Sequence, residues 1–196
     1  SMELMKKAII FADKLGIRVI QLAGYDVYYE EGNEQTKKYF IENLKKAVEW
    51  AASMEVTLAI EIMDHPFINS ITKYMEFSEI INSPWLKVYP DVGNLTAWPT
   101  NNTLSELELG IKQGEIVAIH LKDTLAVTDT FPGKFKEVPF GNGCVDFPKV
   151  FAKLKELNYK GPFLIEMWTE KSDDPIEEVK KAKQWILDKM KEGGFI

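Results

Sequence analysis

Residues 57–66 read TLAIEIMDHP, a short apolar run that contains a carboxylate near its end. In an extended chain its alternating faces carry Leu58, Ile60 and Ile62 on one side and Ala59, Glu61 and Met63 on the other. Apolar residues on both faces are typical of a parallel strand that is covered on both sides. Glu61 in such a strand must be paired, protonated or bound to a metal, because an isolated buried charge is too costly.

Three further strand-like runs also end on a potential metal ligand. They are LKVYPDVGN with Asp91, EIVAIHLKD with His120 and GPFLIEMW with Glu166. The steps from Glu61 through these residues are 30, 29 and 46 positions, and a strand-plus-helix unit takes about 30 residues. We therefore expect all four side chains at the carboxyl ends of successive parallel strands, where α/β barrels carry their chemistry.

The rest of the chain alternates strands with helices. Apolar spacing and end signals predict strands at 17–23, 56–62, 86–91, 116–121 and 162–167, and helices at 3–15, 35–53, 71–81, 103–114, 147–158 and about 175–191. Thr103 and Glu106 have the spacing of a capping box at one helix start. Residues 124–147 form a long loop, which explains the 46-residue step and is of a length that is often functional.

This alternation predicts an α/β fold, a parallel (β/α) barrel of about five units, with residues 1–196 as a single domain. A closed barrel has eight strands, so either a truncated barrel or a complete five-stranded open sheet fits the pattern. In both cases the first strand has an exposed edge that invites pairing with another chain, which favours a homo-oligomer.

Bulk properties exclude several classes of partner. The chain has 196 residues, 45% hydrophobic and 28% charged, and a net charge of −6. An acidic chain argues against a nucleic-acid partner, and no apolar run approaches the roughly 20 residues of a membrane helix. Cys144 is the single cysteine, which fits a reducing cytoplasm.

Two glutamates, an aspartate and a histidine form a coherent ligand set for a divalent metal ion. Oxygen donors with one imidazole suit Mn²⁺, Mg²⁺, Co²⁺ or Zn²⁺. The alternative for His120 is a satisfied core histidine, and for Asp91 a helix cap, since PDVGN also reads as a turn.

Two carboxylates on opposite sides of a carbon next to a carbonyl can remove a proton and return it. A metal that binds the neighbouring oxygens stabilises the enediolate formed in between. The pair Glu61 and Glu166 therefore predicts epimerisation or isomerisation rather than hydrolysis, for which an activated water is needed.

Six motifs in order carry a resemblance to a known family. LAGYDVYYEE, LAIEIMD, VYPDVGN, IHLKDT, VPFGNGCVDF and FLIEMW resemble the sugar-phosphate 3-epimerases of the xylose-isomerase-like barrel superfamily, in particular the L-ribulose-5-phosphate 3-epimerases of bacterial L-ascorbate catabolism. The resemblance covers almost the whole chain and corresponds to the fourth through eighth βα units of that barrel. It implies that the first three units are absent.

The resemblance also implies site residues and a substrate. Glu61, Asp91, His120 and Glu166 would bind the metal, with Glu61 and Glu166 as the acid/base pair. The substrate would be a ketopentose phosphate, with L-ribulose and L-xylulose 5-phosphates interconverted. Substrate-binding residues bordering the pocket would be Lys122, Asp123, Gly141 and Gly143, the two glycines because their backbone N–H groups can approach an anion, although an ordinary glycine turn is the alternative.

Two nearby residues refine this expectation. His65 follows Asp64 in a loop and is expected to be solvated or structural rather than a ligand. Asn94 stands where related free-sugar epimerases carry a second histidine, which favours the phosphate branch.

Three other functions are alternatives to the epimerase. A catalytically impaired barrel remnant could bind a ligand or only self-associate, and activity with added metal, compared before and after chelation, discriminates it. A DNA-repair endonuclease of the same superfamily is disfavoured by the two histidines of the chain and its acidic charge. A cofactor-binding open sheet is disfavoured because QLAGYD offers a single glycine after the first strand.

Overall fold

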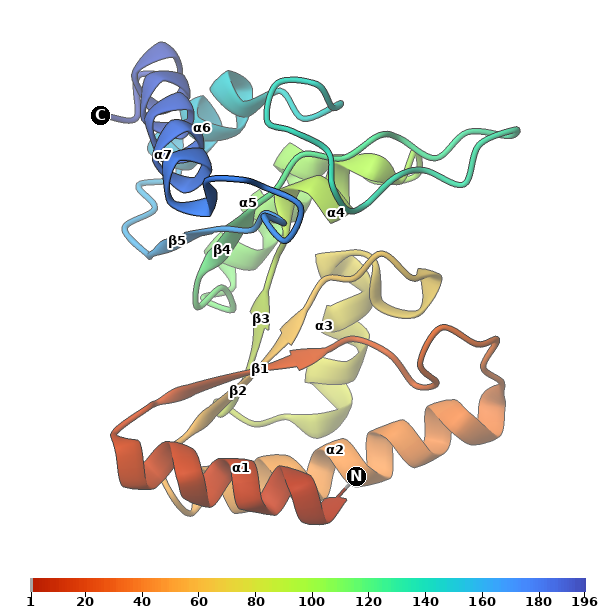
Figure 1. The fold of residues 1–196 in the computed structure, drawn as a ribbon. Helices are drawn as coiled ribbons and strands as arrows, with labels where there is room; N and C mark the ends of the chain where they lie inside the picture. The colour runs from red at the N-terminus through yellow and green to blue at the C-terminus, as the bar shows by residue number, and fades with distance from the viewer. Residues whose placement is uncertain (1) are drawn as a thin grey trace. The chain divides into compact units, whose positions relative to one another are not determined.

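The computed structural model describes residues 2–196, which divide into two compact units between Tyr89 and Pro90. Each unit is built from parallel strands and helices (Figure 1). Five strands alternate with helices as the sequence predicts, and each lies within or at the bounds of its expected range. None of the helices in the described part of the chain combines the length and apolar composition that crossing a membrane requires.

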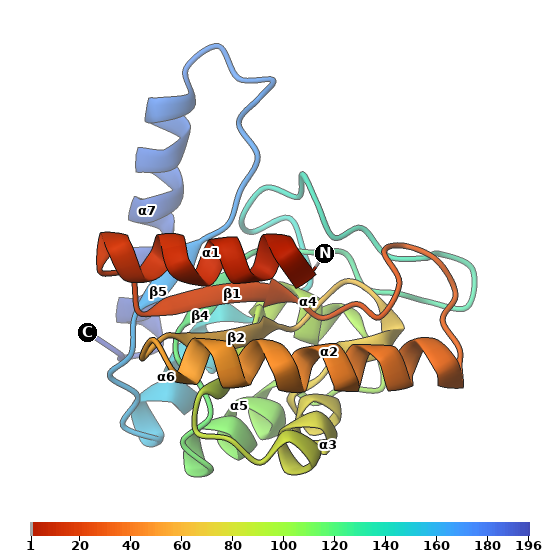
Figure 2. The same cartoon turned by 90° about the horizontal axis from the view of Figure 1, so that it is seen from below.

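The first unit is a three-stranded parallel sheet flanked by helices (Figure 2). Its elements are α1 (Met2–Leu15), β1 (Val19–Ala23), α2 (Glu34–Ala52), β2 (Thr57–Glu61), the short 3₁₀ helix η1 (Pro66–Ile68), α3 (Ile71–Ile81) and β3 (Leu86–Tyr89). The strand order β1-β2-β3 follows the chain, as repeated βα units require. The central strand β2 is buried from Leu58 to Glu61, which confirms the two-sided burial expected of TLAIE.

Glu61 lies at the carboxyl end of the central strand of this sheet. Ala23 is the partner of Glu61 across β1 and β2, and Tyr89 is its partner across β2 and β3. The carboxyl ends of all three strands therefore lie level with Glu61. β1 pairs only with β2 in the described residues, so its second edge carries no strand there.

The second unit contains two paired strands and four helices. They are α4 (Val92–Ala97), α5 (Thr103–Lys112), β4 (Ile119–Leu121), α6 (Phe147–Glu156), β5 (Phe163–Ile165) and α7 (Pro175–Glu192). β4 and β5 are parallel, with His120 opposite Leu164. A parallel bridge joins Asp91 to His120, so Asp91 continues the sheet beside β4.

Two local details differ from the sequence expectation. The N-cap of α5 is Asn102, whose side chain accepts the backbone N–H of Ser105, so the Thr103–Glu106 capping box is wrong by one residue. Asparagine is a strong N-cap in its own right. The helix α4 was not expected, because its six residues, VGNLTA, are too few to show a helical period.

The long loop 124–146 contains two isolated antiparallel bridges, Leu125 with Lys134 and Thr128 with Phe131. They shape its first half into a hairpin-like excursion. The second half returns to the end of β4 through backbone N–H groups that bind Asp123, described below.

Candidate metal centre

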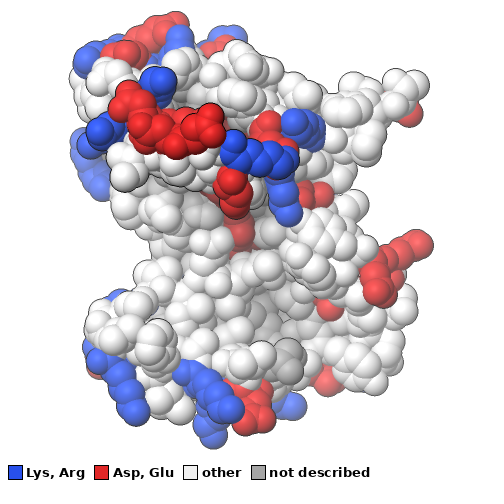
Figure 3. Space-filling model, in the orientation of Figure 1, with Lys and Arg blue, Asp and Glu red and all other residues white. Residues whose placement is uncertain are grey.

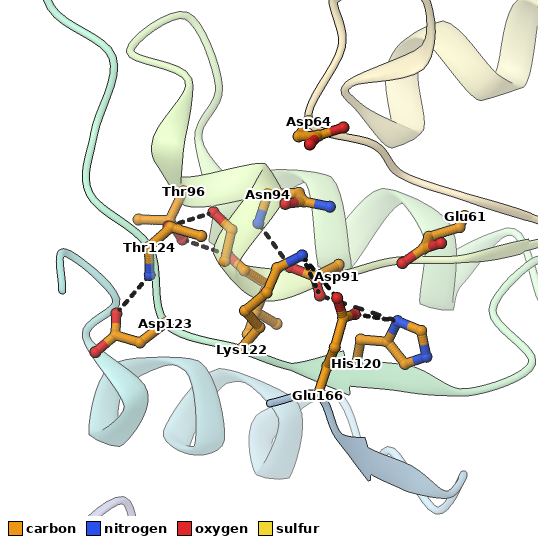
Figure 4. A network of polar contacts seen from close by, with 12 residues as sticks. Glu61, Asp64, Asp91, Asn94, Thr96, His120, Lys122, Asp123, Thr124 and Glu166 are labelled. Carbon is orange, nitrogen blue, oxygen red and sulfur yellow. Dashed lines mark hydrogen bonds and ion pairs between the residues drawn. The ribbon is translucent and has the colours of Figure 1, made fainter. Parts of the chain in front are cut away.

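Three of the four predicted ligands converge in the second unit. Asp91, His120 and Glu166 each offer a ligand atom, and these atoms lie within 4.8 Å of one another. His120 Nδ1 is 3.1 Å from Glu166 Oε2 and 3.9 Å from Asp91 Oδ2. Figure 4 shows their side chains pointing toward one another from the ends of neighbouring strands.

Asp91 has two separate tasks, one for each oxygen. Its Oδ1 accepts the backbone N–H of Asn94 at 2.7 Å and caps α4. Its Oδ2 is buried and accepts no hydrogen bond. The sequence left open whether Asp91 caps a helix or binds a metal; the structure shows the cap, and Oδ2 lies beside His120 and Lys122.

A lysine lies inside this acidic group. Lys122 Nζ is 3.2 Å from Glu166 Oε1 and 3.5 Å from Asp91 Oδ2, and it lies 5.6 Å from the centre of the Trp168 ring. Lys122 is only 4% exposed, and Asp91 is fully buried. The ammonium group therefore neutralises part of a negative charge that burial would otherwise make very costly.

The two carboxyl groups of this cluster differ in their affinity for a proton. Burial raises the pKa of Asp91 to about 7; the charge of Glu166 adds to this effect, while Lys122, the Asn94 N–H and His120 oppose it. For Glu166, burial also favours the neutral form, but His120 and Lys122 outweigh it and lower the pKa to about 2. A proton bound by these two carboxyl groups therefore resides on Asp91, while Glu166 stays ionised.

Glu61 lies in the first unit, at the end of β2, and is 8% exposed. Gln21 on β1 donates a side-chain hydrogen bond of 2.6 Å from Nε2 to Glu61 Oε2. The charge of Glu61 adds to burial in raising the pKa of Tyr89 on the neighbouring strand. The sequence alone does not point to Gln21. Its contact with Glu61 follows from the register of β1 beside β2, which places Gln21 two residues before the partner of Glu61.

A second network occupies the same edge of the first unit. Asp64 accepts hydrogen bonds from the hydroxyls of Tyr25, at 2.5 Å, and Tyr29, at 3.0 Å. Burial and the bond to Asp64 raise the pKa of Tyr25. His65 Nδ1 accepts the backbone N–H of Phe67 and caps η1, which is a structural role.

Asp123 is surrounded by backbone donors from the long loop. Its carboxylate accepts the N–H groups of Thr124, Gly141, Gly143 and Val145 at 2.9 to 3.3 Å. The amides of Gly141 and Gly143, which are expected to approach an anion, contact the carboxylate of Asp123. A Cβ atom at Gly143 would lie 2.0 Å from Asp123 Oδ1, so only glycine allows this approach.

A cavity of about 490 Å³ lies within the second unit. Its walls come from the segments 137–140 and 167–172 and from α7, and they include Phe140, Trp168 and Trp185. Trp168 also contacts Lys122, so its side chain both lines the cavity and touches the acidic cluster.

Comparisons with known proteins agree with this geometry. Residues 1–189 match the model of the family described as xylose isomerase-like TIM barrel. SgbU of Haemophilus influenzae, provisionally named an L-ribulose-5-phosphate 3-epimerase, is 57% identical over the whole chain, which spans 68% of its length. UlaE of Shigella boydii, named an L-ribulose-5-phosphate 3-epimerase, is 51% identical over the whole chain, which spans 66% of its length.

Solved structures show the same fold. An L-ribulose 3-epimerase superposes with a TM-score of 0.79 at 16% identity, over 98% of this chain and 67% of its own. The IOLI protein, solved with a bound zinc atom, superposes with a TM-score of 0.76 at 18% identity, over 99% of this chain and 70% of its own. The predicted fold class and family are confirmed, and this chain belongs to the xylose isomerase-like TIM barrel family.

Proposed function

We propose that this protein is a divalent-metal-dependent 3-epimerase of a ketopentose 5-phosphate that interconverts L-ribulose 5-phosphate and L-xylulose 5-phosphate. The observation that carries the proposal is the convergence of Asp91, His120 and Glu166 at neighbouring strand ends. Relatives that are 51–57% identical over the whole chain are named for this activity. The chain spans about two thirds of their length.

The donor atoms of the cluster fit a divalent cation. Asp91 Oδ2 is buried and accepts no hydrogen bond, and a buried oxygen without a hydrogen bond costs free energy unless something binds it. Carboxylate oxygens with one imidazole suit Zn²⁺, Mn²⁺, Co²⁺ or Mg²⁺. When bound, such an ion supplies positive charge that stabilises the enediolate formed when the C3 proton is removed.

Glu61 and Glu166 are the proposed acid/base pair, and both are also proposed as metal ligands. Glu166 is ionised at neutral pH, since His120 and Lys122 lower its pKa to about 2, so it carries no proton of its own, as a general base requires. Glu61 ends β2 as Glu166 follows β5, and Gln21 holds its Oε2. One carboxylate removes the C3 proton and the other returns a proton to the opposite face, which inverts that carbon.

Four residues are proposed to bind or border the substrate. Lys122 offers a buried ammonium group next to Glu166 and suits a developing negative charge on oxygen. Asp123, Gly141 and Gly143 would border the pocket by holding the long loop in place, because their mutual hydrogen bonds already engage the amides and the carboxylate. Asn94 is buried beside Asp91, and we propose that its presence in place of a second histidine favours a sugar phosphate over a free sugar.

The organisation of the chain is part of the proposal. We assign residues 1–196 to one domain that corresponds to the fourth to eighth βα units of a barrel, working in the cytoplasm. The visible face in Figure 3 carries interspersed acidic and basic side chains on both units, whereas nucleic-acid binding calls for a continuous basic surface.

A second candidate function, self-association, is favoured by the first unit. The second edge of β1 carries no strand in the described residues, and Leu4, Phe11 and Leu15 of α1 are each more than half exposed. An open edge beside exposed apolar side chains is a surface that other chains can cover. It supports a homo-oligomer, with or without catalysis.

The experiment that tests this proposal measures proton exchange at C3 of the substrate. The chain is stripped with chelator, supplied with Mn²⁺ and incubated with L-ribulose 5-phosphate in D₂O, and NMR measures loss of the C3 proton signal and appearance of the epimer. Glu61→Gln and Glu166→Gln should each slow epimerisation by about 10²–10⁴-fold with unchanged circular dichroism. Glu156→Gln on the exposed end of α6 is the control and should keep full activity.

Near-normal turnover by either active-site variant would refute the two-base assignment. If the wild-type chain binds Mn²⁺ but exchanges no proton, the ligand-binding interpretation replaces the enzymatic one.

A further inference from the structure

Lys122 contacts the same two carboxyl groups that are proposed to hold the metal. Its Nζ lies 3.5 Å from Asp91 Oδ2 and 3.2 Å from Glu166 Oε1. Oδ2 is the Asp91 oxygen that accepts no hydrogen bond, whereas Oδ1 already accepts the N–H of Asn94 at 2.7 Å. An ammonium ion and a divalent cation must therefore share or contest one oxygen of Asp91.

The surroundings hold Lys122 in this place. Its side chain is 5% exposed, and its ammonium lies 5.6 Å from the centre of the Trp168 ring. A cation over an indole face, with two carboxylates beside it, is well compensated for its burial. Lys122 follows His120 by two residues, and alternate side chains of an extended chain point to the same face. The Lys122 side chain therefore emerges on the same face as His120.

We infer that Lys122 is a built-in counter-cation of the acidic cluster, which stabilises the folded chain and weakens its affinity for the divalent ion. The inference rests on the proposed metal site and deepens it. A positive charge a few ångströms from a divalent cation is strongly repulsive in a buried site, where water screens little. The same charge compensates the negative charge that Asp91 and Glu166 bring together in a buried place.

One substitution should then move two properties in opposite directions. Lys122→Gln removes the charge and keeps a side chain of similar length that can still donate hydrogen bonds. In chelator, the variant should unfold at lower urea concentration than the wild type, because a buried charge pair loses its partner. Its affinity for Mn²⁺ should rise about tenfold or more, because the competing charge is gone.

The experiment is isothermal titration of the full chain with Mn²⁺ at pH 8, together with urea unfolding in chelator. Lys122→Arg keeps the positive charge and should bind Mn²⁺ within a fewfold of the wild type. Lys153→Gln is the matched control: Lys153 is also well covered and ion-paired, to Glu108 and Glu156, but stands on α6 outside the cluster. It should leave the Mn²⁺ affinity unchanged.

The outcomes separate this inference from the function on which it rests. Tighter Mn²⁺ binding by Lys122→Gln alone supports it. Metal binding by the wild type with equal or weaker binding by Lys122→Gln overturns the inference and leaves the metal site standing. If neither chain binds Mn²⁺, the metal site is refuted, and the inference falls with it.

Discussion

Two buried aspartates in the second unit follow neighbouring strands, and their surroundings differ sharply. Asp123 is 2% exposed and accepts four backbone N–H groups of the long loop. Asp91 is fully buried, accepts one backbone N–H, and keeps Oδ2 among His120, Lys122 and Glu166 with no hydrogen bond. Asp123 therefore uses both oxygens to hold the loop, whereas Asp91 caps α4 with one oxygen and is proposed to bind a metal with the other.

This difference teaches how to separate a structural carboxylate from a functional one. Backbone N–H groups stabilise an anion without bringing a net charge, and they need a loop shaped around it. At Asp91 the buried Lys122 ammonium supplies a positive charge instead, and Oδ2 is left without a hydrogen bond. We expect mutations at the two sites to affect different measurements.

The largest difference should appear in metal affinity. Asp91→Asn replaces an anionic ligand with a neutral amide and should weaken Mn²⁺ binding about 100-fold or more, because charge and a ligand oxygen are lost together. Asp123→Asn should change the affinity less than about threefold, since both its oxygens serve the loop. Calorimetric titration of both variants checks this, and equal losses at the two positions would erase the distinction.

The next difference should appear in stability. Asp123→Asn leaves several backbone donors facing a neutral amide and should lower the free energy of unfolding by about 2–3 kcal/mol. Gly143→Ala should destabilise the chain as well, because its Cβ would lie 2.0 Å from Asp123 Oδ1. Urea unfolding in chelator measures both. Wild-type stability in both variants would show that the loop does not depend on Asp123.

The smallest expected effect is on the pH dependence of metal binding. The pKa of Asp91 is raised to about 7, so below that pH the carboxyl is protonated, and a proton must leave before a metal binds. Mn²⁺ affinity should therefore be roughly tenfold weaker at pH 6 than at pH 8. Glu166, with a pKa of about 2, adds nothing in this range. A flat profile between pH 6 and pH 8 would contradict the protonated state of Asp91.

The periodicity of the sequence predicts the order of strands and helices in this chain. Alternation and strand-end ligands located all five strands, and the four proposed ligands fell at their carboxyl ends. The 30-residue spacing works because each βα unit returns the chain to the same edge of the sheet. The single-domain assignment of residues 1–196 stays a prediction.

What the sequence could not supply depends on partners that are distant in the chain. Gln21 reaches Glu61 across 40 positions, and Gly141 and Gly143 close on Asp123 across 18 and 20. No local pattern encodes these pairs, since strand register and loop geometry create them. Lys122 was identified only as a pocket residue, because its ion pairs with Asp91 and Glu166 exist only once the strands are assembled.

The most direct test of the central claim is a crystal structure of the chain grown with Mn²⁺, with anomalous scattering used to locate the ion. The account predicts one strong peak within coordination distance, about 2.0–2.3 Å, of Asp91, His120 and Glu166, with Glu61 as the proposed fourth ligand. A manganese peak at another place, or none beside these three side chains at saturating metal, would contradict it.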